Sequence, residues 1–149
     1  MYRIREVDAL DDEVADLLGD LHRMTFLNSA PLPQFDTGHW WIASLRGAPV
    51  AFAGIVPSVL IPGCGYFCRV GVVRSHWGRG LQLRLMRVME HRARRNGWHG
   101  VVSDTTDNIA SANNFIRAGY RLFEPRVPWG WASTLYWRKP LNPRSRIED

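Results

Sequence analysis

The segment over residues 66–96 limits the fold of this chain more than any other part of the sequence. A β-like run that ends at Val73 passes through a turn with glycine at positions 78 and 80 into a helix that begins near Leu81. Glycine lets a backbone bend sharply and approach a ligand closely. The first N–H groups of a helix have no partner within it, so they can donate to an anion such as a phosphate group. The segment therefore predicts a strand, a turn and a helix with an anion-binding loop.

Two faces of different character divide the helix predicted over residues 81–96. Apolar residues recur at the i, i+4, i+7 and i+8 spacing of one helical face, namely Leu81, Leu85, Val88 and Met89. Basic residues occupy another face: Arg84, Arg87, His91, Arg94 and Arg95. The apolar face predicts packing against a sheet, whereas the basic face can meet solvent or an anionic partner.

A second strand and helix follow further along the chain. An apolar pair at residues 101 and 102 predicts a strand over residues 101–103, which leads into a polar run. Asp107 or Asn108 is expected to cap a helix that runs to residue 118, and Gly119 is expected to end it. A further strand is expected after this glycine.

The two motifs resemble those of the GNAT superfamily of acyl-CoA-dependent N-acyltransferases. The first resembles its acyl-CoA loop, V-x-P-x-x-R/Q-G-x-G-x-G/A, at Val72, Gly78 and Gly80. The second resembles its N-x-x-A-x-x-x-Y-x-x-x-G-F segment, at Asn108, Ser111, Phe115, Gly119 and Tyr120. Both motifs stand in the family's order and spacing, and with the flanking strands the resemblance covers about residues 40–141.

The resemblance implies a GNAT-like fold, which is an α/β domain with a mixed central sheet of about six to seven strands flanked by helices. We expect one such domain over residues 1–149, with a loose polar tail over about residues 142–149. Strands are predicted over residues 2–7, 40–45, 50–56, 66–73, 101–103, 120–123 and 134–139, and helices over residues 13–24, 81–96 and 109–118. A hairpin turn is predicted at residues 46–49. The irregular loops over residues 25–39 and 124–133 are expected to form the acceptor site.

Composition and charge limit the class of protein. No run approaches eighteen apolar residues and the N-terminus has no apolar signal region, so we expect a cytoplasmic protein without a membrane span. Cys64 and Cys68 are expected to be thiols rather than a disulfide, and no metal site is expected. A net charge of +5 favours an anionic partner, either nucleic acid or a phosphate-bearing cofactor. Nearly all of this charge is arginine, which suits phosphate but also follows from a base-composition bias in coding DNA.

The resemblance further implies acetyl-CoA as the acyl donor. The backbone of Val70, Gly71 and Val72 would hold the pantetheine arm and the acyl carbonyl. The turn would hold the pyrophosphate through its N–H groups, with the residues Trp77, Gly78, Arg79, Gly80, Leu81 and Gln82. Asn108 would contact the pantetheine arm from the opposite side, and Phe115 is the other helix residue assigned to the cofactor.

Three residues depart from the family pattern. Trp77 stands where arginine or glutamine is usual, and Gln82 stands where glycine or alanine is usual. Phe115 aligns with the tyrosine that many members use as a general acid, and a phenyl ring cannot donate a proton. Ser111 or a water molecule would then protonate the CoA thiolate, or the thiolate leaves unassisted. A packing role for Phe115 beside Ile109 and Ala112 is the alternative.

A general base is harder to assign, because residues 66–73 contain no glutamate or aspartate. Asp104, expected at the end of its strand, is the first choice for accepting a proton, directly or through water. A capping or surface role for this aspartate is the alternative. His39 and His76 can titrate near neutral pH, and Asp36 in a long loop can bind a cationic acceptor. Ordinary surface or hydrogen-bonded roles are the favoured interpretation of these three residues.

The resemblance thus implies an N-acetyltransferase that transfers an acetyl group from acetyl-CoA to a primary amine by direct attack in a ternary complex. The acceptor is expected to be a small-molecule or peptide amine, with a nucleic-acid-linked amine and a homodimer as further options. One alternative is a nucleic-acid-binding module that uses the arginine face of helix 81–96 with exposed tryptophans. Another is an acyl-CoA binder that has lost turnover.

Overall fold

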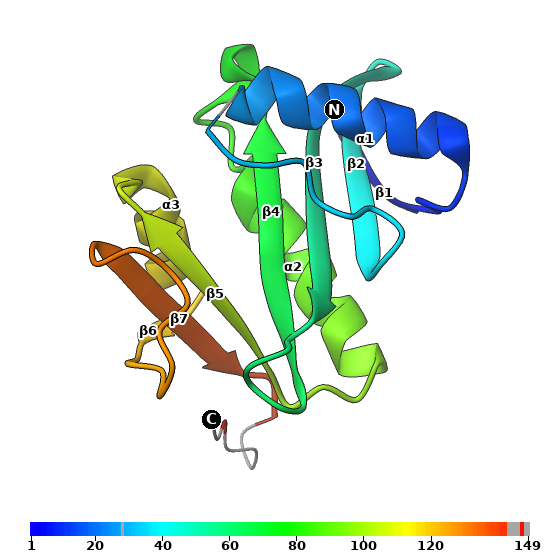
Figure 1. The fold of residues 1–149 in the computed structure, drawn as a ribbon. Helices are drawn as coiled ribbons and strands as arrows, with labels where there is room; N and C mark the ends of the chain where they lie inside the picture. Colours follow the sequence, from blue (N-terminus) through cyan, green and yellow to red (C-terminus); the bar gives the residue numbers. More distant parts are fainter. Residues whose placement is uncertain (28, 143–146, 148–149) are drawn as a thin grey trace. The chain divides into compact units, whose positions relative to one another are not determined.

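A computed structural model describes residues 1–27, 29–142 and 147 of the chain. Seven strands form one mixed sheet in the order β1-β2-β3-β4-β5-β7-β6, accompanied by helices (Figure 1). The strands are β1 (Tyr2–Val7), β2 (His39–Leu45), β3 (Ala48–Pro57), β4 (Cys64–Val72), β5 (Gly100–Thr106), β6 (Arg121–Leu122) and β7 (Thr134–Pro140). The helices are α1 (Asp12–Phe26), the short 3-10 helix η1 (Arg74–His76), α2 (Leu81–Arg95) and α3 (Ile109–Arg117). The predicted mixed α/β sheet flanked by helices is confirmed.

The chain divides into two compact units, one formed by residues 1–56 and 68–85 and the other by residues 57–67 and 86–149. Strand β4 and helix α2 each contribute residues to both units. A single domain over residues 1–149 stays a prediction. The predicted tail over residues 142–149 lies mostly outside the described residues.

The first unit contains an antiparallel sheet of β1, β2 and β3. The turn between β2 and β3 consists of Arg46 and Gly47, which both have positive φ. Such a two-residue turn matches the right-handed twist of hairpin strands. Ala48 and Pro49 therefore belong to β3, and the predicted four-residue turn was too long.

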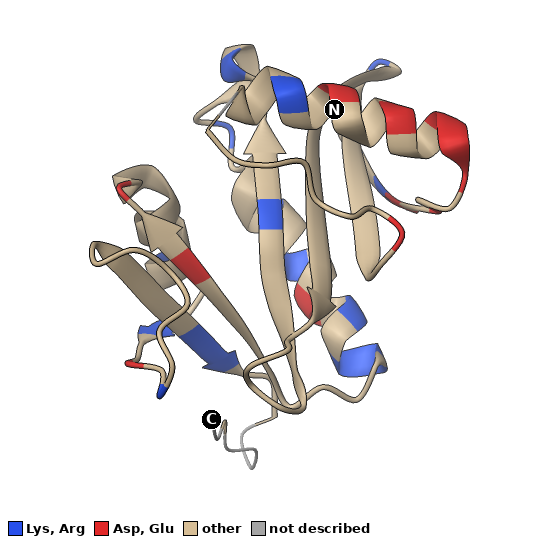
Figure 2. Ribbon diagram, in the orientation of Figure 1, with Lys and Arg blue, Asp and Glu red and all other residues tan. Residues whose placement is uncertain are grey.

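Helix α1 covers this sheet with its apolar face. Asp11 caps the helix by accepting a hydrogen bond from the backbone N–H of Glu13, and Figure 2 shows acidic residues toward the start of the helix, where the helix dipole favours them. The buried residues of the contact form one cluster: Leu18, Leu21, Phe35, Trp40, Ile42 and Phe52. This cluster is the core of the first unit.

The second unit is built around β5. The start of β4 pairs with it in parallel, with Tyr66 opposite Val102, and β7 pairs with it antiparallel along its whole length. Because β7 also pairs with residues 103–106, the polar run that follows Val102 belongs to the strand. The predicted strand end at residue 103 was wrong, and Asp104 lies within β5, opposite Tyr136.

Helix α2 follows its predicted bounds closely. Its apolar face is buried through Leu81, Leu85, Met86, Met89 and Ala93. Arg84, Arg87, His91, Arg94 and Arg95 are exposed, and Figure 2 shows basic residues toward its C-terminal end. Among the tryptophans, Trp77 and Trp131 are exposed and the others are buried or half-buried. No described helix is long and apolar enough to cross a bilayer.

One acidic residue of α2 is buried as well. Glu90 is 4% exposed, and its carboxylate accepts hydrogen bonds from Lys139 Nζ at 2.7 Å and from the Tyr120 hydroxyl at 3.1 Å. Lys139 also donates to the carbonyl of Ala118. The only lysine of the chain thus neutralises a buried carboxylate in the core of the second unit.

Candidate functional site

The loop that follows β4 has the conformation that its glycines predict. Gly78 and Gly80 have φ values of 74° and 75°, in the left-handed region that favours glycine. A Cβ atom placed on either residue would meet no other atom within 4 Å, so the backbone is open on this side. A ligand can therefore approach the main chain of the loop without displacing a side chain.

The loop also offers hydrogen-bond donors. The backbone N–H groups of Gly78, Arg79 and Gly80 donate to no other described residue. Helix α2 begins at Leu81, directly after the loop, so the N–H groups of its first turn and the positive end of its dipole lie next to these donors. This arrangement suits a phosphate group.

Trp77 does not take the place of the usual arginine or glutamine as a phosphate contact. Its indole Nε1 donates to the carbonyl of Val72 at 2.7 Å, and the guanidinium of Arg74 lies 5.5 Å from its ring. The side chain therefore holds the loop against the end of β4. The same hydrogen bond engages the carbonyl oxygen of Val72, a residue whose backbone is expected to hold the pantetheine arm.

Arginines and Tyr2 surround the same loop. Arg79 donates to the Tyr2 hydroxyl at 3.2 Å, and this hydroxyl is 2.7 Å from Nδ1 of His76. Arg84 donates to the backbone carbonyl of Tyr2 at 3.5 Å. His76 thus links β1 to the loop, while Arg74, Arg79 and Arg84 bring three exposed positive charges to it.

The glycine assigned to the pantetheine contact also has a packing role. A Cβ atom on Gly71 would lie 2.4 Å from Oγ1 of Thr25 and 2.6 Å from the ring of Phe52. Any larger residue would push α1 away from the sheet. The close approach of α1 is therefore sufficient to explain this glycine.

A pair of basic side chains in the first unit, the buried His22 and the half-buried Arg69, was missed from the sequence. Arg69 of β4 donates from Nε to Nε2 of His22 at 3.4 Å and from Nη2 to the carbonyl of Pro31 at 3.1 Å. Burial lowers the pKa of His22, and the charges of Arg69 and Arg23 lower it further. The neutral ring lines a pocket of about 390 Å³ beside residues 29–32. The spacing of His22 from Leu18 on the buried face of α1 was the available signal.

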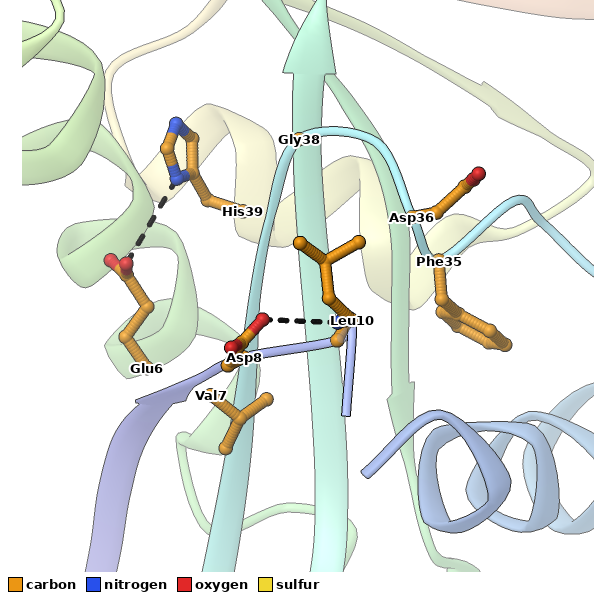
Figure 3. A pocket seen from close by; sticks show the side chains of 9 residues that line it. Glu6, Val7, Asp8, Leu10, Phe35, Asp36, Gly38 and His39 are labelled. Atoms are coloured by element: carbon orange, nitrogen blue, oxygen red, sulfur yellow. Dashed lines mark hydrogen bonds and ion pairs between the residues drawn. The ribbon is translucent and has the colours of Figure 1, made fainter. Parts of the chain in front are cut away.

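Another pocket in the first unit contains two of the predicted residues. Figure 3 shows Asp36 and His39 together with Glu6 and Asp8, in a pocket of about 370 Å³ where β1 ends and β2 begins. His39 Nδ1 lies 3.9 Å from the Glu6 carboxylate, and Asp8 accepts a hydrogen bond from the backbone N–H of Leu10. Asp36 and His39 therefore line the same pocket, whereas His76 does not line it.

The second unit holds the other predicted residues. Asn108 caps α3, because its Oδ1 accepts a hydrogen bond from the backbone N–H of Ser111 at 3.0 Å. The amide nitrogen of Asn108 is not used in this cap. Ser111 is half-buried in the first turn of the helix. The cap prediction is confirmed for Asn108, and the cofactor contacts of both residues stay predictions.

Phe115 is a core residue. It is 2% exposed, stacks on Trp137 at 5.8 Å between ring centroids, and meets Phe67 and Tyr120 edge-on at 5.8 and 5.0 Å. Ile109 is 80% exposed, so the predicted packing of Phe115 beside it was wrong. The aromatic enclosure accounts for a phenyl ring at this position.

Asp104 accepts two hydrogen bonds on one oxygen. Its Oδ2 lies 2.5 Å from the Tyr66 hydroxyl and 2.7 Å from the Trp129 indole Nε1. The side chain is half-buried in β5 and neither caps a helix nor lies free on the surface. The sequence singled out the aspartate, but not the two aromatic donors, which are distant from it along the chain.

Both the sequence and the fold are similar to those of known acyltransferases. The sequence matches the model of the acetyltransferase (GNAT) family over residues 7–120. A protein from Klebsiella pneumoniae, provisionally identified as an acyl-CoA N-acyltransferase, is 26% identical with a TM-score of 0.73, and the match covers 95% of this chain and 99% of that one. No curated protein matches the sequence significantly.

More distant structures share the fold. A provisionally identified acetyltransferase from Salmonella typhimurium, solved with its cofactor acetyl-CoA, is 17% identical with a TM-score of 0.73 and coverage of 99% and 98% of the two chains. An aminoglycoside 6'-acetyltransferase type Ii is 19% identical with a TM-score of 0.76 and coverage of 95% and 99%. Such likenesses extend over nearly the whole of each chain.

Proposed function

Because the chain belongs to the acetyltransferase (GNAT) family, we propose that it transfers an acetyl group from acetyl-CoA to a primary amine. The observation that carries this proposal is the open glycine loop at the start of α2, where unpaired backbone N–H groups adjoin three exposed arginines. A pyrophosphate needs several donors and positive charge at close range. The loop supplies both within a few residues.

The residues of the loop bind the donor in this proposal. The backbone N–H groups of residues 78–81 hold the pyrophosphate, whereas the N–H of Trp77 already donates to the carbonyl of Arg74. Arg74, Arg79 and Arg84 neutralise phosphate charge. The backbone N–H and C=O groups of residues 70–72 hold the pantetheine arm. The carbonyl of Val72 is the exception, because it accepts the hydrogen bond from Trp77. Asn108 contributes its side-chain amide nitrogen, which its helix cap does not use.

Bound acetyl-CoA supplies an activated thioester: the amine nitrogen bonds to the acetyl carbon, the C–S bond breaks, and the CoA thiolate takes up a proton equivalent to the one that the amine loses. Ser111 or a water molecule delivers that proton, because Phe115 has none to give. The sequence assigns removal of the amine proton to Asp104, whose Oδ1 is the oxygen that both aromatic donors leave free. The chain thus serves chiefly to orient the two substrates.

A pair of glycine variants tests the loop. Gly80→Glu places a carboxylate against the proposed pyrophosphate, so we expect acetyl-CoA binding in calorimetric titration to weaken beyond detection. Gly47→Glu is the matched control, because Gly47 has φ of 83°, equally open surroundings and the same unit. Both changes impose similar backbone strain. Equal affinity of the two folded variants for acetyl-CoA would contradict the assignment of the loop.

A second candidate function is acyl-CoA binding without turnover. The enclosure of Phe115 in the aromatic core favours it, because the position of the usual general acid is closed to substrates. The thiol released from acetyl-CoA in the presence of a primary amine distinguishes the two. Release that depends on the amine supports the transferase, whereas tight binding with no release supports the second candidate.

A further inference from the structure

The second unit surrounds the carboxylate of Asp104 with aromatic rings, and the proposed function does not explain these rings. Asp104 is bonded to Tyr66 and Trp129 through Oδ2. The ring of Trp129 meets Tyr66 edge-on at 6.3 Å and Tyr136 edge-on at 4.7 Å, and Phe123 lies within 6.5 Å of Trp129 and of Tyr136. We call these five residues the carboxylate–aromatic cluster.

Strand register places the members of the cluster together. Tyr66 pairs with Val102 in β5, two residues before Asp104, and Tyr136 pairs with Asp104 directly. Side chains two residues apart on a strand share a face, and so do those of paired residues. The loop after β6 then adds Trp129, and the N–H of Gly130 donates to the Tyr136 hydroxyl at 2.8 Å, which fixes this loop.

The charge of Asp104 has no cation partner in the described part of the chain. Both of its donors are neutral, and its Oδ1 accepts no hydrogen bond from a described residue. A half-buried carboxylate with no counter-ion is unfavourable in a folded protein. Glu90, by contrast, is neutralised by Lys139. One cation does adjoin the cluster, because the guanidinium of Arg138 lies 4.9 Å from the centroid of the Phe123 ring, but Arg138 forms no ion pair with Asp104 in the described part of the chain. The carboxylate of Asp104 therefore stays available to a ligand.

Aromatic rings next to a carboxylate are the chemistry that recognises organic ammonium ions. The rings attract a cation through their faces while they contact its alkyl groups, and the carboxylate supplies the opposite charge. Tyr66, Phe123 and Trp129 are half-buried rather than sealed, so solvent reaches the cluster. Loop 124–133, which supplies Trp129, is also one of the two segments expected to form the acceptor site.

We propose that the carboxylate–aromatic cluster binds an ammonium group of the amine acceptor, an assignment that rests on the proposed function. An opposite charge at close range keeps an ammonium group protonated, and a protonated amine cannot attack a thioester. The bound group is therefore one that does not react, and the acceptor is a diamine or polyamine. Asp104 then selects the substrate, in place of the proton-acceptor role that the sequence assigns to it.

Binding of a non-reacting probe tests the cluster apart from catalysis. Choline is a quaternary ammonium ion, and 3,3-dimethylbutan-1-ol has the same shape without charge. We expect choline, and not the alcohol, to shift the Trp129 indole N–H resonance in a saturable way, with Trp129→Phe used for assignment. An equal response to both compounds, or no response to either, would overturn the proposal without any variant of Asp104.

Asp104→Asn removes the charge and keeps an oxygen for both aromatic donors. We expect it to weaken choline binding about tenfold or more, whereas Asp107→Asn, which makes the same change at an exposed acid of the same unit, leaves choline binding unchanged. Choline affinity that is unaffected by Asp104→Asn would contradict the proposal. Circular dichroism establishes that the variants are folded.

Steady-state kinetics with acetyl-CoA then separates selection from proton transfer. With putrescine as acceptor, we expect Asp104→Asn to raise KM about tenfold, with a much smaller rise for butylamine, which lacks the second ammonium group. A fall in kcat for both amines would instead identify Asp104 as the proton acceptor and overturn the assignment. Loss of acetyl-CoA binding in the wild type would contradict the proposed function, while the choline titration would still decide whether the cluster binds ammonium.

Discussion

Glu90 and Asp104 are two acids of the same unit with opposite surroundings. Glu90 is neutralised by Lys139, accepts a hydrogen bond from Tyr120 and is closed to solvent. Asp104 has two neutral donors on one oxygen and is half-buried. An acid that the fold neutralises is a structural element, whereas an acid left with its charge is available to a ligand. Changes around Glu90 should therefore affect stability, whereas changes at Asp104 should affect ligand binding.

Loss of the lysine should have the largest effect. Lys139→Met leaves the buried carboxylate of Glu90 without a cation, so we expect the free energy of unfolding to fall by about 3 kcal/mol. A larger loss is not expected, because Lys139 is itself partly exposed. Denaturant titration measures it. The double variant Glu90→Gln with Lys139→Met should recover part of the loss, since it removes the orphaned charge. A change below about 1 kcal/mol in Lys139→Met would contradict the interpretation that Glu90, unlike Asp104, is an acid that the fold must neutralise.

The two tyrosines form a matched pair for the next effect. Tyr120→Phe deletes a hydroxyl that is buried against Glu90, and we expect it to cost about 2 kcal/mol in unfolding free energy. Tyr66→Phe deletes a hydroxyl on the half-buried Asp104, and we expect about 1 kcal/mol or less. The same denaturant titration compares them. The reverse order would show that Asp104, rather than Glu90, supports the fold.

Alkaline pH should affect the Glu90 side of the comparison. Burial, and then the charge of Glu90, raise the pKa of Tyr120 well above its ordinary value of 10.0. The folded state therefore keeps this proton while the unfolded chain releases it, so stability should fall as the pH rises above about 10. Tyr120→Phe should reduce this slope in thermal unfolding measured between pH 9 and pH 11. An unchanged slope would mean that Tyr120 is not the group responsible.

The smallest effect on stability is expected for Asp104→Asn. The amide oxygen can still accept from Tyr66 and Trp129, and no cation is left unpaired, so we expect a change within about 1 kcal/mol. Thermal unfolding checks this. A large destabilisation would identify Asp104 as a structural acid like Glu90 and weaken the case for an ammonium site.

The sequence predicted the elements with strong local signals. The glycine loop, the bounds of α2 and the cap at Asn108 follow from spacing and capping chemistry, which act over a few residues. The end of β5 was missed because polar residues 103–106 look like a loop until β7 pairs with them. The turn at Arg46 and Gly47 was predicted too long, because Ala48 and Pro49 pair with β2 and the local sequence does not show this pairing.

The site was predictable only where it is local. Backbone donors at Gly78 and Gly80 can be read from the motif. The pairing of Glu90 with Lys139, of Arg69 with His22, and of Asp104 with its aromatic donors joins residues far apart in sequence. Spacing along the chain carries no such information.

Calorimetric titration of the wild-type protein with acetyl-CoA, in moderate salt and beside a single-stranded oligonucleotide, tests the account most directly. We predict saturable acetyl-CoA binding near micromolar strength, about −8 kcal/mol, with no comparable heat from the oligonucleotide. A folded protein that gives no heat with acetyl-CoA, and that binds the oligonucleotide with steep salt dependence, would contradict it. The exposed arginines of α2 would then serve a nucleic-acid partner.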